Sequence, residues 1–158
     1  MGFTFTDAVG ALAAVEGGGR IVVAKGLSGS TILDDSYNAN PASMLAALDL
    51  LQQMGGRRIA VLADMLELGS FEAEGHRMVG ERAATVVDWL ITIGERAQTI
   101  AAEARRAGLS AHSIESVESN SAAVNLLRRK LRRGDFLLIK GSHAMRLDEV
   151  VNAIRATA

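Results

Sequence analysis

From Gly29 onward, short apolar segments alternate with longer segments whose apolar residues recur at the helical period. This alternation is typical of βαβ units, in which helices cover both faces of a parallel sheet. The predicted strands are 31–33, 58–63, 89–93, 110–114 and 136–139, and the predicted helices are 41–52, 72–87, 95–107, 120–132 and 147–156. The sequence therefore predicts an α/β, Rossmann-like, doubly wound domain with a mainly parallel sheet of about five to six strands.

The first 27 residues do not follow this alternation. An alanine-rich helix with Thr6 as its N-cap is expected to run to Glu16, where a run of three glycines breaks it. We therefore predict two parts. Residues 1–27 are the tail of a preceding domain with a linker, and residues 28–158 are the Rossmann-like domain.

Composition and charge narrow the class of protein. Hydrophobic residues make up 49% of the 158 residues and charged residues 22%, as in a globular domain and unlike a disordered or fibrous chain. The formal net charge of -1 gives no general attraction to nucleic acid or anionic lipid. The absence of cysteine agrees with a reducing cytoplasm, and no signal peptide or membrane anchor is recognisable. We expect a cytoplasmic protein without a nucleic-acid or membrane partner.

One cluster of positive charge stands apart from this average. Residues 128–133 read Arg-Arg-Lys-Leu-Arg-Arg at the end of a predicted helix. Cations at a helix C-terminus interact favourably with the helix dipole and are normally solvated. No aromatic residue is interleaved to stack on bases, so the sequence favours a solvated surface over a nucleic-acid site.

Three polar segments follow predicted strands and are the candidate site. In open α/β sheets, ligands bind outside the carboxyl ends of the strands, where the strand order reverses. The segments are 34–40 after the first predicted strand, 64–69 after the second and 140–143 after the fifth. We therefore expect a ligand at the edge of the sheet where these segments begin.

The segment 34–41 concentrates two carboxylates, a phenol, two carboxamides and a hydroxyl. One interpretation is structural: Asn40 or Ser36 caps the next helix, Pro41 occupies its first turn, and the aspartates are solvated turn residues. The other is functional: the aspartates bind a ribose hydroxyl or a metal-bound group, and the amides orient a polar substrate. The sequence alone leaves both open.

The segment Lys140-Gly141-Ser142-His143 combines a cation, a flexible backbone and two hydrogen-bonding side chains. Such a set suits a carboxylate or phosphate ligand. The competing interpretation is a glycine-allowed turn from which the Lys140 ammonium reaches solvent.

The remaining candidates favour structural roles. Asp64 and Glu67 lie in the second segment. Their carboxylates could stabilise a turn or the start of a helix as readily as they could bind a ligand. His76 and His112 have no metal partner near them in sequence, so we predict structural histidines and no metal site.

Two common nucleotide-binding motifs are absent from the sequence. It contains no G-x-x-x-x-G-K-[ST] phosphate loop, and no G-x-G-x-x-G follows the first predicted strand. The sequence therefore gives no support for a phosphate loop or for a nicotinamide-binding domain within this chain.

Three segments together resemble a known family. They are 35–44 (Asp-Ser-Tyr-Asn-Ala-Asn-Pro-Ala-Ser-Met), 61–69 (Val-Leu-Ala-Asp-Met-Leu-Glu-Leu-Gly, with His76 beyond it) and 138–142 (Leu-Ile-Lys-Gly-Ser). Their order and spacing resemble the Mur ligases of bacterial cell-wall synthesis, in particular those that add D-alanyl-D-alanine. The resemblance covers residues 1–158, although Ala63 stands where the family usually has glycine.

The resemblance implies a place in a three-domain enzyme and a reaction. This chain is similar to the carboxy-terminal domain, preceded by the end of the central ATPase domain. In the implied reaction, ATP phosphorylates the carboxylate of UDP-N-acetylmuramoyl-tripeptide, and the amine of D-alanyl-D-alanine attacks the acyl phosphate to give an amide, ADP and phosphate. Mg²⁺ is the implied cofactor. The family's phosphate loop and magnesium ligands lie in the central domain, so the isolated chain is expected to be inactive and to contain no catalytic residue of its own.

The resemblance also implies roles for individual residues. Those that resemble the family's nucleotide-binding positions are Arg20, Asp35, Tyr37, Asn38 and Asn40. Those that resemble the edge receiving D-alanyl-D-alanine are Lys140, Ser142 and His143, since the free carboxylate of the dipeptide needs a cation and donors.

A signalling receiver domain phosphorylated on aspartate is the alternative. Receiver domains also have five βα units, an acidic pair after the first strand, here Asp34 and Asp35, and a lysine after the fifth, here Lys140. Their phospho-accepting aspartate ends the third strand, where this chain has Ile93-Gly94, and Asp64 lies one strand too early. The sequence therefore favours the ligase resemblance.

Overall fold

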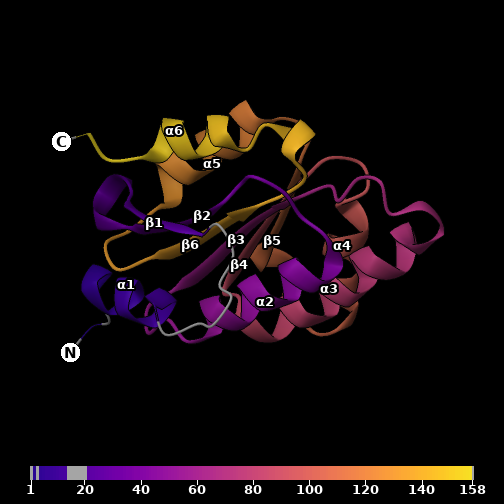
Figure 1. Ribbon diagram of the computed structural model, residues 1–158, viewed down its shortest axis with the longest axis horizontal. Helices are drawn as coiled ribbons and strands as arrows, with labels where there is room; N and C mark the ends of the chain where they lie inside the picture. The colour runs from indigo at the N-terminus through magenta and orange to yellow at the C-terminus, as the bar shows by residue number, and fades with distance from the viewer. Residues whose placement is uncertain (1, 3, 14–20, 158) are drawn as a thin grey trace.

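A six-stranded sheet runs through the middle of the protein, as the computed structural model shows for residues 2, 4–13 and 21–157 (Figure 1). Its order is β1-β2-β6-β3-β4-β5, with β1 antiparallel to β2 and all other neighbours parallel. The strands are β1 (Val22–Lys25), β2 (Thr31–Asp35), β3 (Arg58–Ala63), β4 (Trp89–Ile93), β5 (Ile114–Val117) and β6 (Phe136–Lys140). The predicted fold class is therefore confirmed.

Two layers of helices cover the sheet. They are α1 (Phe5–Ala13), α2 (Pro41–Gln52), α3 (Glu72–Val86), α4 (Gln98–Arg106), α5 (Asn120–Lys130) and α6 (Asp148–Ile154). The chain advances from β3 through β4 to β5 and then returns, so that β6 lies between β2 and β3. Because right-handed crossovers change face when the direction reverses, α1 to α4 lie on one face and α5 and α6 on the other (Figure 1). No helix in the described ranges is long and apolar enough to cross a membrane.

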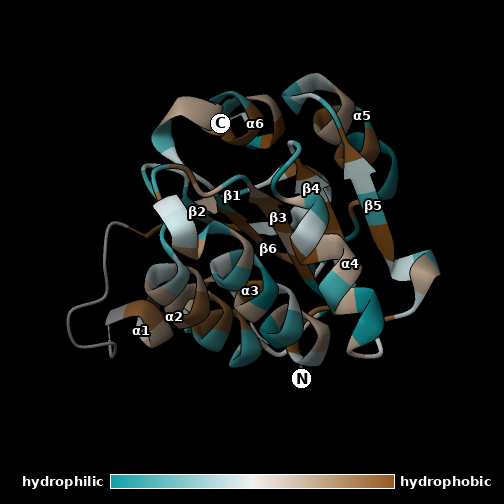
Figure 2. Cartoon of the chain, turned by 90° about the vertical axis from the view of Figure 1, so that its right-hand side faces the viewer, coloured by the Kyte–Doolittle hydropathy of each residue, from teal (hydrophilic) through white to brown (hydrophobic). Residues whose placement is uncertain are grey.

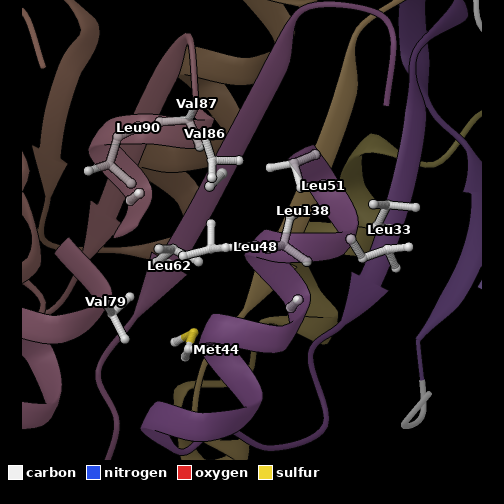
Figure 3. Close-up of a cluster of buried hydrophobic side chains, with 14 of the residues drawn as sticks. Leu33, Met44, Leu48, Leu51, Leu62, Val79, Val86, Val87, Leu90 and Leu138 are labelled. Atoms are coloured by element: carbon white, nitrogen blue, oxygen red, sulfur yellow. The ribbon is translucent and has the colours of Figure 1, made fainter. Parts of the chain in front are cut away.

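Each face of the sheet buries its own apolar cluster. On one face, Leu48 of α2 packs over Leu62 and Leu138, all fully buried (Figure 3). Val61 and Ile139, one position along the same strands, point to the other cluster beneath α5 and α6 because successive strand side chains alternate. Figure 2 shows the result, with hydrophobic central strands between helices that present hydrophilic residues outward. Burial on both faces explains why these strands read as continuous apolar runs.

Two predicted strands, 58–63 and 89–93, match β3 and β4 residue for residue. The predicted strand at 110–114 is wrong. In that region, Ala111–Ser113 form a short 3-10 turn, which begins where the Ser110 side chain accepts the backbone N–H of His112, and β5 starts only at Ile114. Serine competes for backbone hydrogen bonds in this way and so ends regular structure.

The amino-terminal region differs from the prediction in two ways. Thr4, not Thr6, caps α1: its hydroxyl accepts the N–H of Asp7, and its own N–H donates to the Asp7 carboxylate. In addition, β1 was not predicted, and it pairs with β2 although it falls within residues 1–27. Residues 14–16 of the predicted helix lie outside the described residues. The division of the chain at residue 27 stays a prediction.

Asn40 caps α2, as the structural interpretation of the segment 34–41 predicts. Its side chain accepts the N–H of Ser43 at 2.8 Å, and the Ser43 hydroxyl accepts the N–H of Asn40 at 3.0 Å. Because N-cap substitutions typically cost about 1 kcal/mol, we expect Asn40→Ala to lower the free energy of unfolding by about that amount in urea denaturation. Asn40→Asp, which keeps an acceptor, is the matched control, and an equal loss in both variants would contradict a capping role.

Candidate functional site

The three polar segments predicted from the sequence meet at one edge of the sheet. They follow β2, β3 and β6, and the strand order places β6 directly between the other two. Lys140 at the end of β6 is in register with Asp35 on one side and with Leu62 on the other. The topology therefore confirms that these segments are neighbours, at the edge where ligands of such sheets bind.

A buried ion pair joins the ends of β2 and β6. The Lys140 ammonium donates to the Asp35 carboxylate at 2.6 Å and to the backbone carbonyl of Asn38 at 2.9 Å. The side chains of Lys140 and Asp35 are only 2% and 12% exposed. The interpretation that Lys140 reaches solvent is therefore wrong, because its charge is satisfied inside the protein.

Burial and the ion pair act on the Asp35 carboxyl in opposite directions. Burial raises the pKa of Asp35 above its ordinary value because it disfavours the charged form, and the bond from Lys140 opposes this rise. The bond from Lys140 thus favours the charged form of the Asp35 carboxyl, which burial disfavours.

Ser142 ties β6 to the segment after β3. Its hydroxyl accepts the N–H of Leu66 at 2.8 Å, and its own N–H donates to the carbonyl of Asp64 at 3.0 Å. The Asp64 side chain in turn accepts the N–H of Ala97, after β4, at 2.7 Å. These bonds hold the loops after three neighbouring strands, β6, β3 and β4, in one arrangement.

Arg96 is the residue at this edge that the sequence analysis missed. Its guanidinium lies 3.6 Å from the Asp64 carboxylate and donates to Glu72 at 2.8 Å. The attraction of these carboxylates raises the pKa of Arg96, with Glu72 the larger cause. No local motif marks Arg96, because its partners are distant in sequence.

His76 is a structural residue, as predicted. Its Nε2 accepts the N–H of Met65 at 3.1 Å, so its Nδ1 is the protonated nitrogen and donates to the carbonyl of Glu72 at 2.7 Å. With 1% exposure and both ring nitrogens occupied, His76 fixes the loop after β3 against α3.

Exposed polar groups of the loops after β2 and β6 include Tyr37, Asn38 and His143. The rings of Tyr37 and His143 lie 5.4 Å apart between centroids and are tilted by 48°, so they bridge the loops after β2 and β6. Asp34, by contrast, accepts both the N–H and the hydroxyl of Ser36 in a local turn. Arg20 lies outside the described residues. The candidate site thus has buried groups that hold the loops together and exposed side chains, Tyr37, Asn38 and His143 among them, above these groups.

The strand order and the covering helices define the chain as a doubly wound, Rossmann-like α/β domain whose polar edge is formed by three adjoining loops. The family profile described as "Mur ligase, glutamate ligase domain" matches residues 19–143. This chain belongs to the Mur ligase family, which confirms the resemblance found from its motifs.

Curated relatives narrow the resemblance further. The UDP-N-acetylmuramoyl-tripeptide--D-alanyl-D-alanine ligase of Escherichia coli K12 is 32% identical over 140 residues, or 87% of this chain and 29% of the relative. The ligase of the same name from Bacillus subtilis is 31% identical over 137 residues, or 85% of this chain and 30% of the relative. The chain therefore spans less than a third of the length of these relatives.

Solved structures agree with the curated relatives. MurF ligase from Thermotoga maritima, in complex with ADP, superimposes with a TM-score of 0.73 at 28% identity, covering 85% of this chain and 30% of that one. MurF from Acinetobacter baumannii gives a TM-score of 0.71 at 27% identity, covering 84% and 29%.

The strand order speaks against the receiver-domain alternative. Numbered along the chain, the five parallel strands have the order 1-5-2-3-4, whereas receiver domains have the order 2-1-3-4-5.

Proposed function

We propose that this chain is the carboxy-terminal domain of an ATP-dependent ligase that joins D-alanyl-D-alanine to UDP-N-acetylmuramoyl-tripeptide. The observation that supports this most directly is the match of 85% or more of the chain to two curated ligases with that substrate in their names. Because the chain spans only 29% and 30% of those ligases, the parent enzyme must supply the remaining domains, including a central ATPase domain.

In this proposal the exposed edge contributes to nucleotide and dipeptide binding when the domains close. Tyr37 offers a ring for stacking, and Asn38 a carboxamide that donates and accepts, which fits a nucleoside. His143, beside Tyr37, is placed to contact the dipeptide. The resemblance to the ADP complex of the Thermotoga maritima enzyme supports a nucleotide near this domain.

The proposal gives the buried groups of this edge a positioning role. The predicted roles of Asp35 in nucleotide binding and of Lys140 and Ser142 in dipeptide binding stay predictions. In the structure, Asp35 and Lys140 neutralise each other, and Ser142 accepts from Leu66. We infer that these three residues position the loops that bear Tyr37 and His143.

Mg²⁺ belongs to the proposal only through the parent enzyme. In the part of the chain that the structure describes, no three His, Cys, Asp or Glu side chains lie together so as to hold a metal ion. The Asp35 carboxylate is paired with Lys140 and Asp34 with Ser36, so the described residues do not fit a magnesium site.

The proposal is tested by exchanging domains. The aligned carboxy-terminal segment of the Escherichia coli ligase is replaced by this chain, and ADP release is measured with UDP-N-acetylmuramoyl-tripeptide, with and without D-alanyl-D-alanine. We expect ADP and the amide product only when both substrates are present. L-alanyl-L-alanine should not replace the dipeptide.

The matched control is the same exchange with the segment from Acinetobacter baumannii MurF, whose identity to this chain is 27%. An active control together with a folded but inactive chimera of this chain would refute the proposal. Activity with a different amino acid in place of the dipeptide would refute the proposed substrate.

A further inference from the structure

A second polar surface lies at the opposite, amino-terminal edge of the sheet. Two hollows of about 410 and 340 Å³ share Arg57, which precedes β3, and Arg132, which precedes β6. Their other cationic linings are Arg129, Lys130 and Arg133. These five residues are called the basic edge below.

Internal pairs account for two of these five charges. Arg57 binds the buried carboxylate of Asp135 at 2.7 Å, and Lys130 binds Glu115 at 2.9 Å. Both cations also lie over the ring of Trp89, at 5.8 and 5.2 Å from its centroid. The indole of Trp89 is only 5% exposed, so it is a fixed support that keeps both cations at this surface.

Three guanidinium groups remain, against one exposed carboxylate, Asp88, which lines the larger hollow and accepts the N–H of Arg58. Arg129, Arg132 and Arg133 are exposed, and within the described ranges none of their side chains forms an ion pair. The dipole of α5 accounts for cations in its last turn, but the helix ends at Lys130, before Arg132 and Arg133. Like charges repel one another, and an anion from outside would offset this repulsion.

We propose that the basic edge binds a phosphate-bearing anion. Guanidinium groups match phosphate oxygens with paired donors, and both hollows, each lined by Arg132, are large enough for a phosphate group. The large exposed hydrophobic side chains of the described residues are Val9, Val22, Tyr37 and Phe71, and none lines these hollows. The contact is therefore electrostatic, whether the phosphate is free in solution or part of a lipid headgroup. It is independent of the proposed ligase function.

The first experiment uses pyrophosphate as the probe. Titration into the ¹⁵N-labelled chain at low salt is expected to shift the backbone amides of residues 57–58 and 129–134. Arg132→Ser should weaken binding about fivefold, since one charge-assisted hydrogen bond is lost. Arg105→Ser is the matched control, because Arg105 is an exposed arginine in the last turn of α4 that lines neither hollow.

The second experiment distinguishes the source of the phosphate. Co-sedimentation of the chain with phosphatidylglycerol vesicles is compared with phosphatidylcholine vesicles, again with both variants. Pyrophosphate binding alone identifies a soluble anion, and Arg132-dependent sedimentation with phosphatidylglycerol identifies a headgroup. The proposal is overturned if neither probe binds, if the shifts fall on residues 35–40 instead, or if Arg105→Ser weakens binding as much as Arg132→Ser.

Discussion

Lys140→Met is expected to lower the free energy of unfolding by about 3 kcal/mol at neutral pH. The substitution keeps most of the buried side-chain volume but removes the ammonium that Asp35 and the Asn38 carbonyl share. The Asp35 carboxylate would then be buried without a partner, and that state is far more costly than loss of the pair itself. Urea denaturation followed by circular dichroism measures the loss.

The double variant Lys140→Met with Asp35→Asn separates a lost ion pair from a damaged core. Removing both charges leaves no buried ion, so most of the stability should return. If the double variant is as unstable as Lys140→Met alone, the loss comes from packing. If the free energy of unfolding of Lys140→Met lies within about 1 kcal/mol of that of the unchanged chain, the ion pair does not stabilise the site.

The loss should also depend on pH. In the folded chain burial raises the pKa of Asp35 above its ordinary value, and removal of Lys140 removes the opposing influence, so the rise becomes larger. A raised pKa means that the folded state binds more protons than the unfolded state between the ordinary and the folded pKa. Stability therefore falls as pH rises through that window. The difference in the free energy of unfolding between Lys140→Met and the unchanged chain should be smallest at acidic pH and largest at neutral pH.

Much of the fold follows from local sequence patterns. The strands β3 and β4 are continuous apolar runs between clear helix signals, and their predicted bounds match the structure. The short edge strands β1 and β5 were missed or misplaced because neither is fully buried. Their position is set by pairing with a neighbouring strand, which a local pattern does not encode.

The adjacency of the three segments of the candidate site could be predicted, but the pairing of side chains within it could not. The rule that ligands collect at carboxyl ends selected the three segments, and the strand order brings them together. The bond from Lys140 to Asp35 spans 105 positions, and the sequence offers 18 acidic residues as partners. Only the register of β2 against β6 places this particular pair side by side.

The buried and the exposed residues of the candidate site therefore have different roles. Residues that look like ligands in the sequence, such as Lys140 and Ser142, are engaged with the protein itself in the structure. The exposed groups Tyr37, Asn38 and His143 are then the better candidates for direct contact with a substrate. A buried layer that fixes the loops beneath an exposed layer is how a binding edge is pre-organised.

Gly94→Ala should be the second strongly destabilising change, because Gly94, the residue that follows β4, lies directly against Asp64. Its φ of +106° is a conformation that residues with a side chain rarely adopt, and an added Cβ would lie 2.4 Å from the Asp64 carboxylate oxygen that accepts the N–H of Ala97. Strain and overlap together should cost about 3 kcal/mol.

Gly108→Ala is the matched control for Gly94→Ala. Gly108 has a φ of +113° but no atom within 4 Å of an added Cβ, so this variant has the backbone strain without the collision. We expect it to lose only about 1 kcal/mol in urea denaturation. The Ala97 amide resonance should move in Gly94→Ala and stay in place in Gly108→Ala, since only the former displaces Asp64. Equal losses of stability in the two variants would show that backbone strain alone, and not the fit of Asp64 beneath the loop after β4, requires glycine at position 94.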